Sequence, residues 1–214
     1  LALVKHWLGK TGHRRVCFAG GVALNCLMNQ KIRELPEVDE IFVPPVSSDA
    51  GLALGAAYLE AVAHHEKVSP LGHAYWGPSY LSADIKRVLD RAGAKYRVAT
   101  DPADEAARII EEGKILGWFQ GRMEFGPRAL GCRSILANPR VADMKDIINM
   151  RVKFREEYRP LAPAILHQRG GEFFEDYADS PYMTQTFRTK GNLADVAPAV
   201  VHADGTARLQ SVHA

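Results

Sequence analysis

Apolar positions in the first part of the chain alternate between short β-favouring runs and stretches with helical spacing. Residues 16–19 and 41–43 are β-favouring runs, and glycine or proline follows each of them. The apolar residues from about position 23 recur at helical spacing, and that helix is expected to end near Leu35 because Pro36 disfavours a helical residue before it. Residues 51–62, rich in alanine and leucine, predict a second helix. This β-α-β-α order predicts an α/β fold with a mostly parallel sheet, whose ligands bind at the carboxyl ends of the strands.

The remaining periodicity predicts further helices and strands. A helix is expected at the start of the chain, and helices capped by Ser82 and Asp101 are expected over 82–91 and up to Gly113. Their apolar residues are expected in the core: Ile85, Val88, Leu89, Ala106, Ile109 and Ile110. Residues 115–119 read as a buried strand, and 207–212 as a strand with no evident partner.

Residues 64–80 carry little periodicity and several glycines and prolines, which places a domain border there and predicts units over 1–68 and 69–214. The first helix begins without a capping residue, and the last strand-like segment is followed by nothing that could complete it. We therefore expect the chain to be an internal piece of a longer protein.

Composition narrows the class of protein. The chain has 214 residues, 47% of them apolar, and a formal net charge of +2, so a sizeable core is expected and no global field favours nucleic acid or an anionic membrane. No apolar run approaches the roughly 18 to 20 residues that would cross a bilayer. The cysteines, Cys17, Cys26 and Cys132, form no CxxC pair, which favours buried free thiols in a reducing cytoplasm.

A glycine- and arginine-rich segment, residues 121–138, directly follows the predicted strand 115–119. Glycines allow backbone N–H groups to approach an anion, and guanidinium groups bind phosphate oxygens in bidentate fashion. Gly121 and Gly126 have Walker A spacing, but Pro127-Arg128-Ala129 stands where that loop needs Lys-Ser/Thr, which excludes a P-loop NTPase. The segment therefore predicts an anion site with Arg128, Arg133 and Ser134 as candidates, the alternative being a surface loop with solvated arginines.

A second basic segment lies between Asn149 and Pro163. Lys153 and Arg155 would face the same way on an extended backbone and could hold one polyanion, whereas on a helix they would diverge. Arg159 follows in the same segment. The alternative is a solvated surface in which Glu156 and Glu157 are the local partners.

Two turns at strand ends carry further candidates. Gly20 and Gly21 would allow a phosphate to approach a helix N-terminus, and Asn25 offers an amide to a ribose or phosphate oxygen, although a plain strand-to-helix turn explains them equally well. Asp49 could bind a divalent metal or cap the following helix.

The motifs 20-GGVALN-25, 44-PPVSSDAG-51 and 126-GPRALG-131 resemble the O-carbamoyltransferases of nodulation and antibiotic biosynthesis over nearly the whole chain. The resemblance implies the end of an ASKHA-type domain followed by a YrdC-like domain. It also implies that Asp49 ligates a divalent metal, usually iron, that Gly20, Gly21 and Asn25 contact nucleotide, and that the Lys-x-Arg motif and its following Tyr-Arg-Pro-Leu-Ala-Pro belong to the YrdC-like half.

The activity implied by the resemblance is transfer of a carbamoyl group from carbamoyl phosphate, through an ATP-derived carbamoyl-adenylate, to the hydroxyl of a small-molecule or saccharide acceptor. Arg128, Lys153 and Arg155 would then be catalytic, with Arg133, Ser134 and Arg159 binding nucleotide. The His-x-x-x-His metal motif of the family is not found in this sequence, so the piece alone is expected to be inactive. A homo-oligomer is allowed, a tRNA threonylcarbamoylation-type factor is disfavoured by the near-neutral charge, and a non-catalytic nucleotide-binding module stays open.

Overall fold

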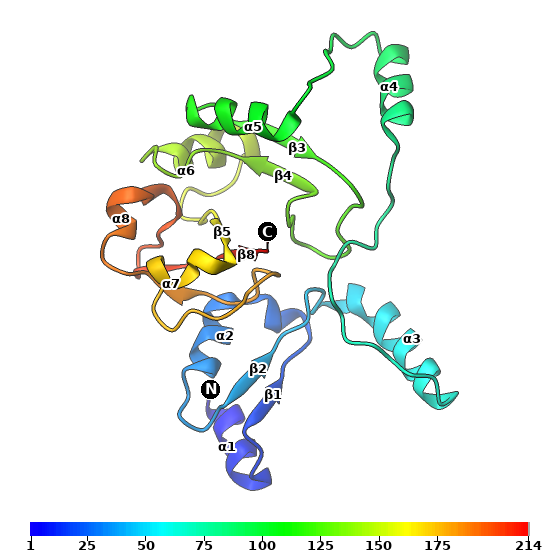
Figure 1. Cartoon of the computed structure of the whole chain (residues 1–214). Coiled ribbons are helices and arrows are strands. Elements are labelled where there is room, and N and C mark those ends of the chain that lie inside the picture. Colours follow the sequence, from blue (N-terminus) through cyan, green and yellow to red (C-terminus); the bar gives the residue numbers. More distant parts are fainter. Residues whose placement is uncertain (214) are drawn as a thin grey trace.

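In the computed structural model, which describes residues 1–213, the amino-terminal strands β1 (Arg15–Cys17) and β2 (Glu40–Phe42) lie parallel, with Val16 opposite Ile41 (Figure 1). The chain between them forms the 3-10 turn η1 (Gly21–Leu24) and helix α2 (Cys26–Arg33). Helix α1 (Ala2–Thr11) precedes the pair, and the turn η2 (Asp49–Gly51) with helix α3 (Leu52–Ala63) follows it. The predicted β-α-β-α order and the parallel pairing are confirmed.

Helix α2 begins later than its apolar spacing predicts. Residues 21–24 form a 3-10 turn, and Asn25 is the N-cap, whose Oδ1 accepts a hydrogen bond from the backbone N–H of Met28 at 3.1 Å. A predicted start near Ala23 is therefore wrong, because the capping side chain, rather than the first apolar residue, decides where the α-helical hydrogen bonds begin.

The core of the amino-terminal unit lies between α1, α2 and the strand pair. It is made by Leu8, Ala23, Ile32, Leu35, Val38, Ile41 and Val43. Cys17, however, is exposed, and Cys26 and Cys132 are only partly buried, so the prediction of buried thiols is wrong for Cys17; all three are free.

Helices α3 and α4 (Ser82–Arg91) stand away from the rest of the chain (Figure 1). Neither contains a buried residue, and Ile85 and Val88 on α4 are 39% and 64% exposed. The expectation that the apolar face of α4 is core is therefore wrong for this structure. Ser82 is also the first helical residue rather than the cap, because the Asp84 carboxylate accepts a hydrogen bond from the N–H of Leu81, one residue earlier.

Helix α5 (Pro102–Glu111) is capped as predicted, since the Asp101 carboxylate accepts from the N–H groups of Ala103 and Asp104. Strand β3 (Leu116–Phe119) follows and pairs antiparallel with β4 (Arg133–Leu136), with Trp118 opposite Ser134. Within residues 1–213 no third strand joins this sheet, and Phe119 is 47% exposed, so the prediction of a buried strand is wrong.

The rest of the carboxy-terminal unit combines short helices with paired strands. Its elements are α6 (Met144–Ile147), the π-helix η3 (Ile148–Lys153), β5 (Ala164–Leu166), η4 (His167–Arg169), α7 (Gly170–Phe173), β6 (Phe187–Arg188), α8 (Leu193–Val196), η5 (Pro198–Val200), β7 (Thr206–Ala207) and β8 (Gln210–Val212). Segment 207–212, which was expected to lack a partner, contains parts of two strands, and each of them pairs with another strand. Strand β7 runs antiparallel to β6, and β8 runs parallel to β5.

Polar contacts join α2 to the carboxy-terminal unit. The buried amide of Asn29 donates to the carbonyls of Ala23 and Thr184 at 2.7 and 2.8 Å, and the Arg33 guanidinium lies over the Phe187 ring, 4.1 Å from its centroid. The Asn29 amide nitrogen is buried and paired, so loss of the Thr184 carbonyl would remove one of its two hydrogen-bond acceptors.

Among residues 1–213, no helix is both long enough and apolar enough to cross a membrane.

A candidate anion-binding cavity

A cavity of about 720 Å³ lies in the carboxy-terminal unit, bordered by the loop before β4, the end of η3, and β8. Cations reach it from separate segments of the chain: Arg128, Lys153, Arg155 and Arg208. No aspartate or glutamate is among the residues of 1–213 that line it. Cationic side chains gathered in a partly enclosed space without carboxylates attract a polyanion, because their attraction to it is screened less there than in bulk water.

The loop from residue 121 to 131 is shaped by glycines and by one buried carboxylate. Gly121, Gly126 and Gly131 have positive φ angles of 57°, 116° and 104°, which glycine adopts without strain. Glu124, whose side chain is fully buried, accepts hydrogen bonds from the N–H groups of Leu130 and Cys132 at 2.6 and 2.8 Å. The buried carboxylate therefore holds the two ends of the loop together.

Arg133 is a further hydrogen-bond donor to the Glu124 carboxylate. Its Nε donates to the Glu124 carboxylate at 2.9 Å. Although burial opposes ionisation, these donors lower the pKa of Glu124 to about 2. Arg133 thus supports the loop, and it is not among the residues that line the cavity.

Arg128 links the cavity to the amino-terminal unit. Its Nη2 donates to the Leu24 carbonyl at 2.9 Å and lies 3.4 Å from the Cys26 Sγ, while its Nε is buried without a partner among residues 1–213. Burial, and then the neighbouring charge of Arg208, lower the pKa of Arg128. The Leu24 carbonyl thus fixes the Arg128 guanidinium at the lining of the cavity.

Lys153 and Arg155 enter the cavity from the end of η3. Phe154, between them, has a left-handed backbone with φ of 48°, which ends the helix, and both neighbouring side chains line the cavity. Arg155 is held by its Nε, which donates to the Asn149 Oδ1 at 2.7 Å. Burial lowers the pKa of both cations, and the charge of Arg208 lowers each of them further.

Arg208 is the cation that sequence reasoning missed. It lies between β7 and β8, lines the cavity, and has a buried Nε without a partner in the described chain. The available signal was a single arginine inside the strand-like run 207–212, where a charge is unusual.

Of the other two residues predicted for this half, one lines the cavity and one does not. Ser134 lines the cavity, and its Oγ accepts a hydrogen bond from the N–H of Gly131 at 3.1 Å. Arg159 lies outside the lining and pairs with Glu156 at 2.6 Å, as the solvated-surface alternative predicts.

The candidates in the amino-terminal unit do not line this cavity. Gly20 has a φ of 97° and its N–H donates to the Ser47 carbonyl at 2.6 Å, while Gly21 begins η1 and Asn25 caps α2. Their local roles match the strand-to-helix turn that the sequence left open.

Asp49 is exposed in the first turn of η2, and neither η2 nor α3 has a side-chain cap, so the alternative role as an N-cap is wrong. The group of His, Asp, Glu or Cys side chains that converges within residues 1–213 lies elsewhere and does not include Asp49. One exposed carboxylate is insufficient for an iron site, so the residues present do not by themselves fit that metal.

Comparisons with known proteins agree with the resemblance. The family models described as carbamoyltransferase N-terminus and carbamoyltransferase C-terminus match residues 3–58 and 107–214. Nodulation protein NolO of Bradyrhizobium diazoefficiens is 42% identical over 98% of this chain and 40% of its own length. Nodulation protein NolNO of Sinorhizobium fredii is 42% identical over 98% of the chain and 32% of its length, and nodulation protein U of the same species is 40% identical over 94% and 35%. The chain spans less than half the length of these relatives, and it belongs to the carbamoyltransferase family.

Proposed function

We propose that the cavity binds carbamoyl phosphate and the phosphates of ATP, and that the complete protein transfers the carbamoyl group to an acceptor hydroxyl. The observation that carries the proposal is the lining: Arg128, Lys153, Arg155 and Arg208 are present and carboxylates are absent among its described residues. Membership of the family supplies the carbamoyl chemistry, and the cations supply the charge that its phosphorylated donor requires.

The proposed donor reaction forms a carbamoyl-adenylate, which retains the α-phosphate of ATP. Water first cleaves the bond between the carbamoyl group and the phosphate, which gives carbamate and inorganic phosphate. A carbamate oxygen then attacks the α-phosphorus of ATP, and pyrophosphate leaves. Both steps move negative charge onto phosphate oxygens. Cations already positioned in a partly desolvated cavity lower the free energy of that charge without reorganisation.

Each cation has a distinct part in this proposal. Arg128 is anchored through Nη2, which fixes its charge at the cavity lining, and Arg155 is anchored through Asn149. Lys153 is a flexible point charge that can follow a phosphate as the charge moves. Arg208 would add a fourth charge from the segment between β7 and β8.

The two units correspond, in this proposal, to the end of an ASKHA-type domain over 1–68 and a YrdC-like domain over 69–214. Separate hydrophobic clusters support the division, since Leu8 to Val43 form one core and Phe174 to Leu209 another. Asp49 would contribute one ligand to a divalent metal in the complete protein, with the other ligands outside this chain, and the acceptor would bind there.

Binding to this chain is the first test. Calorimetric titration with carbamoyl phosphate and with ATP should show binding that Arg128→Gln and Lys153→Met each weaken at least about tenfold, the loss expected from one charge-assisted contact of about 1.5 kcal/mol or more. Arg151→Gln is the matched control, because Arg151 lies in the same segment but does not line the cavity. Equal affinity in all variants would place the anion site elsewhere.

Turnover is tested with the complete gene product. Pyrophosphate release from ATP that depends on carbamoyl phosphate, with one inorganic phosphate for each pyrophosphate, would support the adenylate route. ATP binding without such dependence would favour a nucleotide-binding module, and binding of tRNA that weakens with salt would favour the threonylcarbamoylation-type factor.

A further inference from the structure

The parallel pairing of β5 and β8 places two histidines side by side. In their register Leu166 lies opposite Val212, so the next residues, His167 and His213, leave the carboxyl ends of adjacent strands together. Their imidazole rings stack with centroids 4.5 Å apart. Neither histidine belongs to the anion-binding group of the proposed function, although His213 borders the same cavity.

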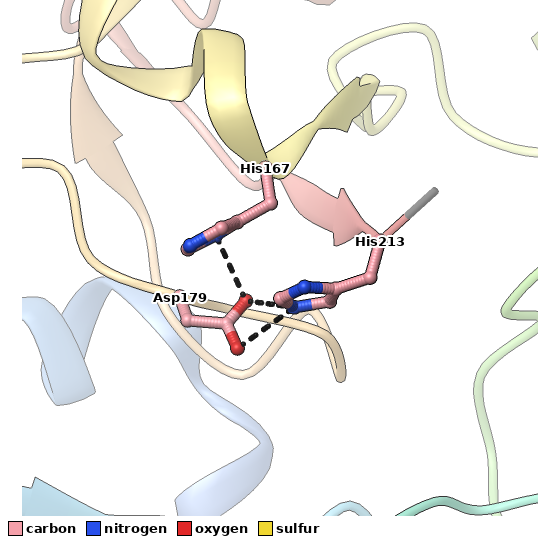
Figure 2. Close-up of side chains that lie close together, drawn as sticks. All are labelled: His167, Asp179 and His213. Carbon is pink, nitrogen blue, oxygen red and sulfur yellow. Dashed lines mark hydrogen bonds and ion pairs between the residues drawn. The ribbon is translucent and has the colours of Figure 1, made fainter.

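Asp179 meets both rings from the loop between α7 and β6 (Figure 2). Its Oδ1 lies 3.5 Å from the His167 Nδ1, and its Oδ2 lies 3.1 Å from the His213 Nε2. One potential ligand atom from each of the three residues lies within 4.8 Å of the others. Ligand atoms on a tetrahedral ion with bonds of about 2.0 to 2.1 Å are about 3.3 Å apart, so small shifts would bring these atoms into a coordination shell.

Strand β8 holds the carboxylate in place. The Ser211 hydroxyl donates to the Asp179 Oδ1, and the Ser180 N–H donates to the Ser211 Oγ at 2.7 Å. Backbone pairing adds to this clamp, since the Ser211 N–H donates to the Ser180 carbonyl at 3.1 Å. Partners of this kind, which orient a ligand without touching the ion, accompany ligating carboxylates in metal sites.

We propose that His167, Asp179 and His213 bind a divalent transition-metal ion of the Zn²⁺ type at the border of the basic cavity. Two imidazoles and one carboxylate suit such an ion, whereas Mg²⁺ and Ca²⁺ take oxygen ligands. The side chains are 38%, 44% and 55% exposed for His167, Asp179 and His213, which leaves space for water or a ligand oxygen at the remaining positions. A three-ligand site of this form is open rather than structural.

The test titrates the 214-residue chain with Zn²⁺ against a chromophoric chelator. One ion per chain is expected, and His167→Ala, His213→Ala and Asp179→Asn should each weaken binding at least about 10- to 100-fold, the loss that even a supporting partner causes. Asp179→Asn keeps an oxygen that accepts the Ser211 hydrogen bond. His64→Ala is the control, because His64 also pairs with a carboxylate, Glu60 at 2.9 Å, on the separate helix α3.

A measurement on the unaltered chain tests the proposal even if the variants fail to fold. Substoichiometric Zn²⁺ should shift the imidazole resonances of His167 and His213 and leave those of His64 in place. The proposal is overturned if the chain binds no stoichiometric Zn²⁺, if the His64 variant loses as much affinity as the others, or if His64 shifts while His167 and His213 do not. None of these readouts uses ATP or carbamoyl phosphate, so the outcome is independent of the proposed function.

Discussion

Arg128 and Arg208 line the same cavity from distant segments, and the Nε of each is buried without a hydrogen-bond partner in the described chain. The charge of Arg208 also lowers the pKa of Arg128. Like charges held together at a cost in folding free energy are typical of a site whose missing partner is an anion.

Replacing Arg208 should have opposite effects with and without ligand. Arg208→Gln removes repulsion of the three other cations, so the free energy of unfolding without anion should stay constant or rise by about 1 kcal/mol or less. The increase in melting temperature caused by saturating pyrophosphate should fall to half or less of the value for the unaltered chain. Thermal unfolding with and without pyrophosphate measures both quantities, and an unchanged increase would contradict the role of Arg208.

The buried Glu124 carboxylate should make the stability of the folded chain sensitive to acid. Its pKa is about 2 in the folded chain against 4.5 for an unperturbed glutamate, so the ionised side chain contributes stability that is complete above about pH 4.5 and is lost as pH falls toward 2. The contribution at pH 7 is about 2 to 3 kcal/mol, because each unit of pKa is worth about 1.4 kcal/mol and Arg133 is partly exposed.

Glu124→Gln should remove that contribution and flatten the stability curve over the same pH range. Urea unfolding at several pH values measures the effect. Glu111→Gln is the control, because Glu111 is exposed on α5. A variant that retains the full pH dependence would show that another carboxylate is responsible.

Gly126 is required both for its backbone angle and for close packing. Its φ is 116°, and a Cβ added there would lie 2.9 Å from the Val46 Cγ2 in the amino-terminal unit. Gly126→Ala should therefore lower the free energy of unfolding by about 1 to 3 kcal/mol.

Gly55→Ala should change the free energy of unfolding in the opposite direction. Gly55 lies within α3 with nothing within 4 Å of an added Cβ, so alanine should stabilise the chain by about 0.5 to 1 kcal/mol. Equal effects of the two substitutions in urea unfolding would be incompatible with the close approach of Gly126 to Val46.

Asn29 should be important for attachment of the amino-terminal unit. It is fully buried, and Asn29→Ala removes the donor to the carbonyls of Ala23 and Thr184, which would cost about 1 to 3 kcal/mol. Denaturant unfolding measures the loss. Asn192→Ala, at an exposed position before α8 without a side-chain cap, should change the free energy of unfolding by less than about 0.5 kcal/mol.

Much of the site could be predicted from the sequence because its signals are local. Glycines beside Arg128 indicated an unusual loop, and the spacing of Lys153 and Arg155 indicated that one extended segment could present both. The structure brings these three cations to one cavity. Lys153 and Arg155 reach it because Phe154, between them, has a left-handed backbone at the end of η3, and not because the segment is extended. Arg133 and Arg159 carry the same local signal, and only their partners, Glu124 and Glu156, separate them from the cavity.

The sequence by itself determined the β-α-β-α order of the first half, the glycine-rich loop before β4 and the family, since each depends on residues close together in the chain. Tertiary structure alone decided that Arg208 joins the basic cavity, that β8 pairs with β5, and that Ile85 and Val88 stay exposed. The physical reason is that periodicity shows which residues share a face, whereas the surface against which that face packs is supplied by segments far away in sequence.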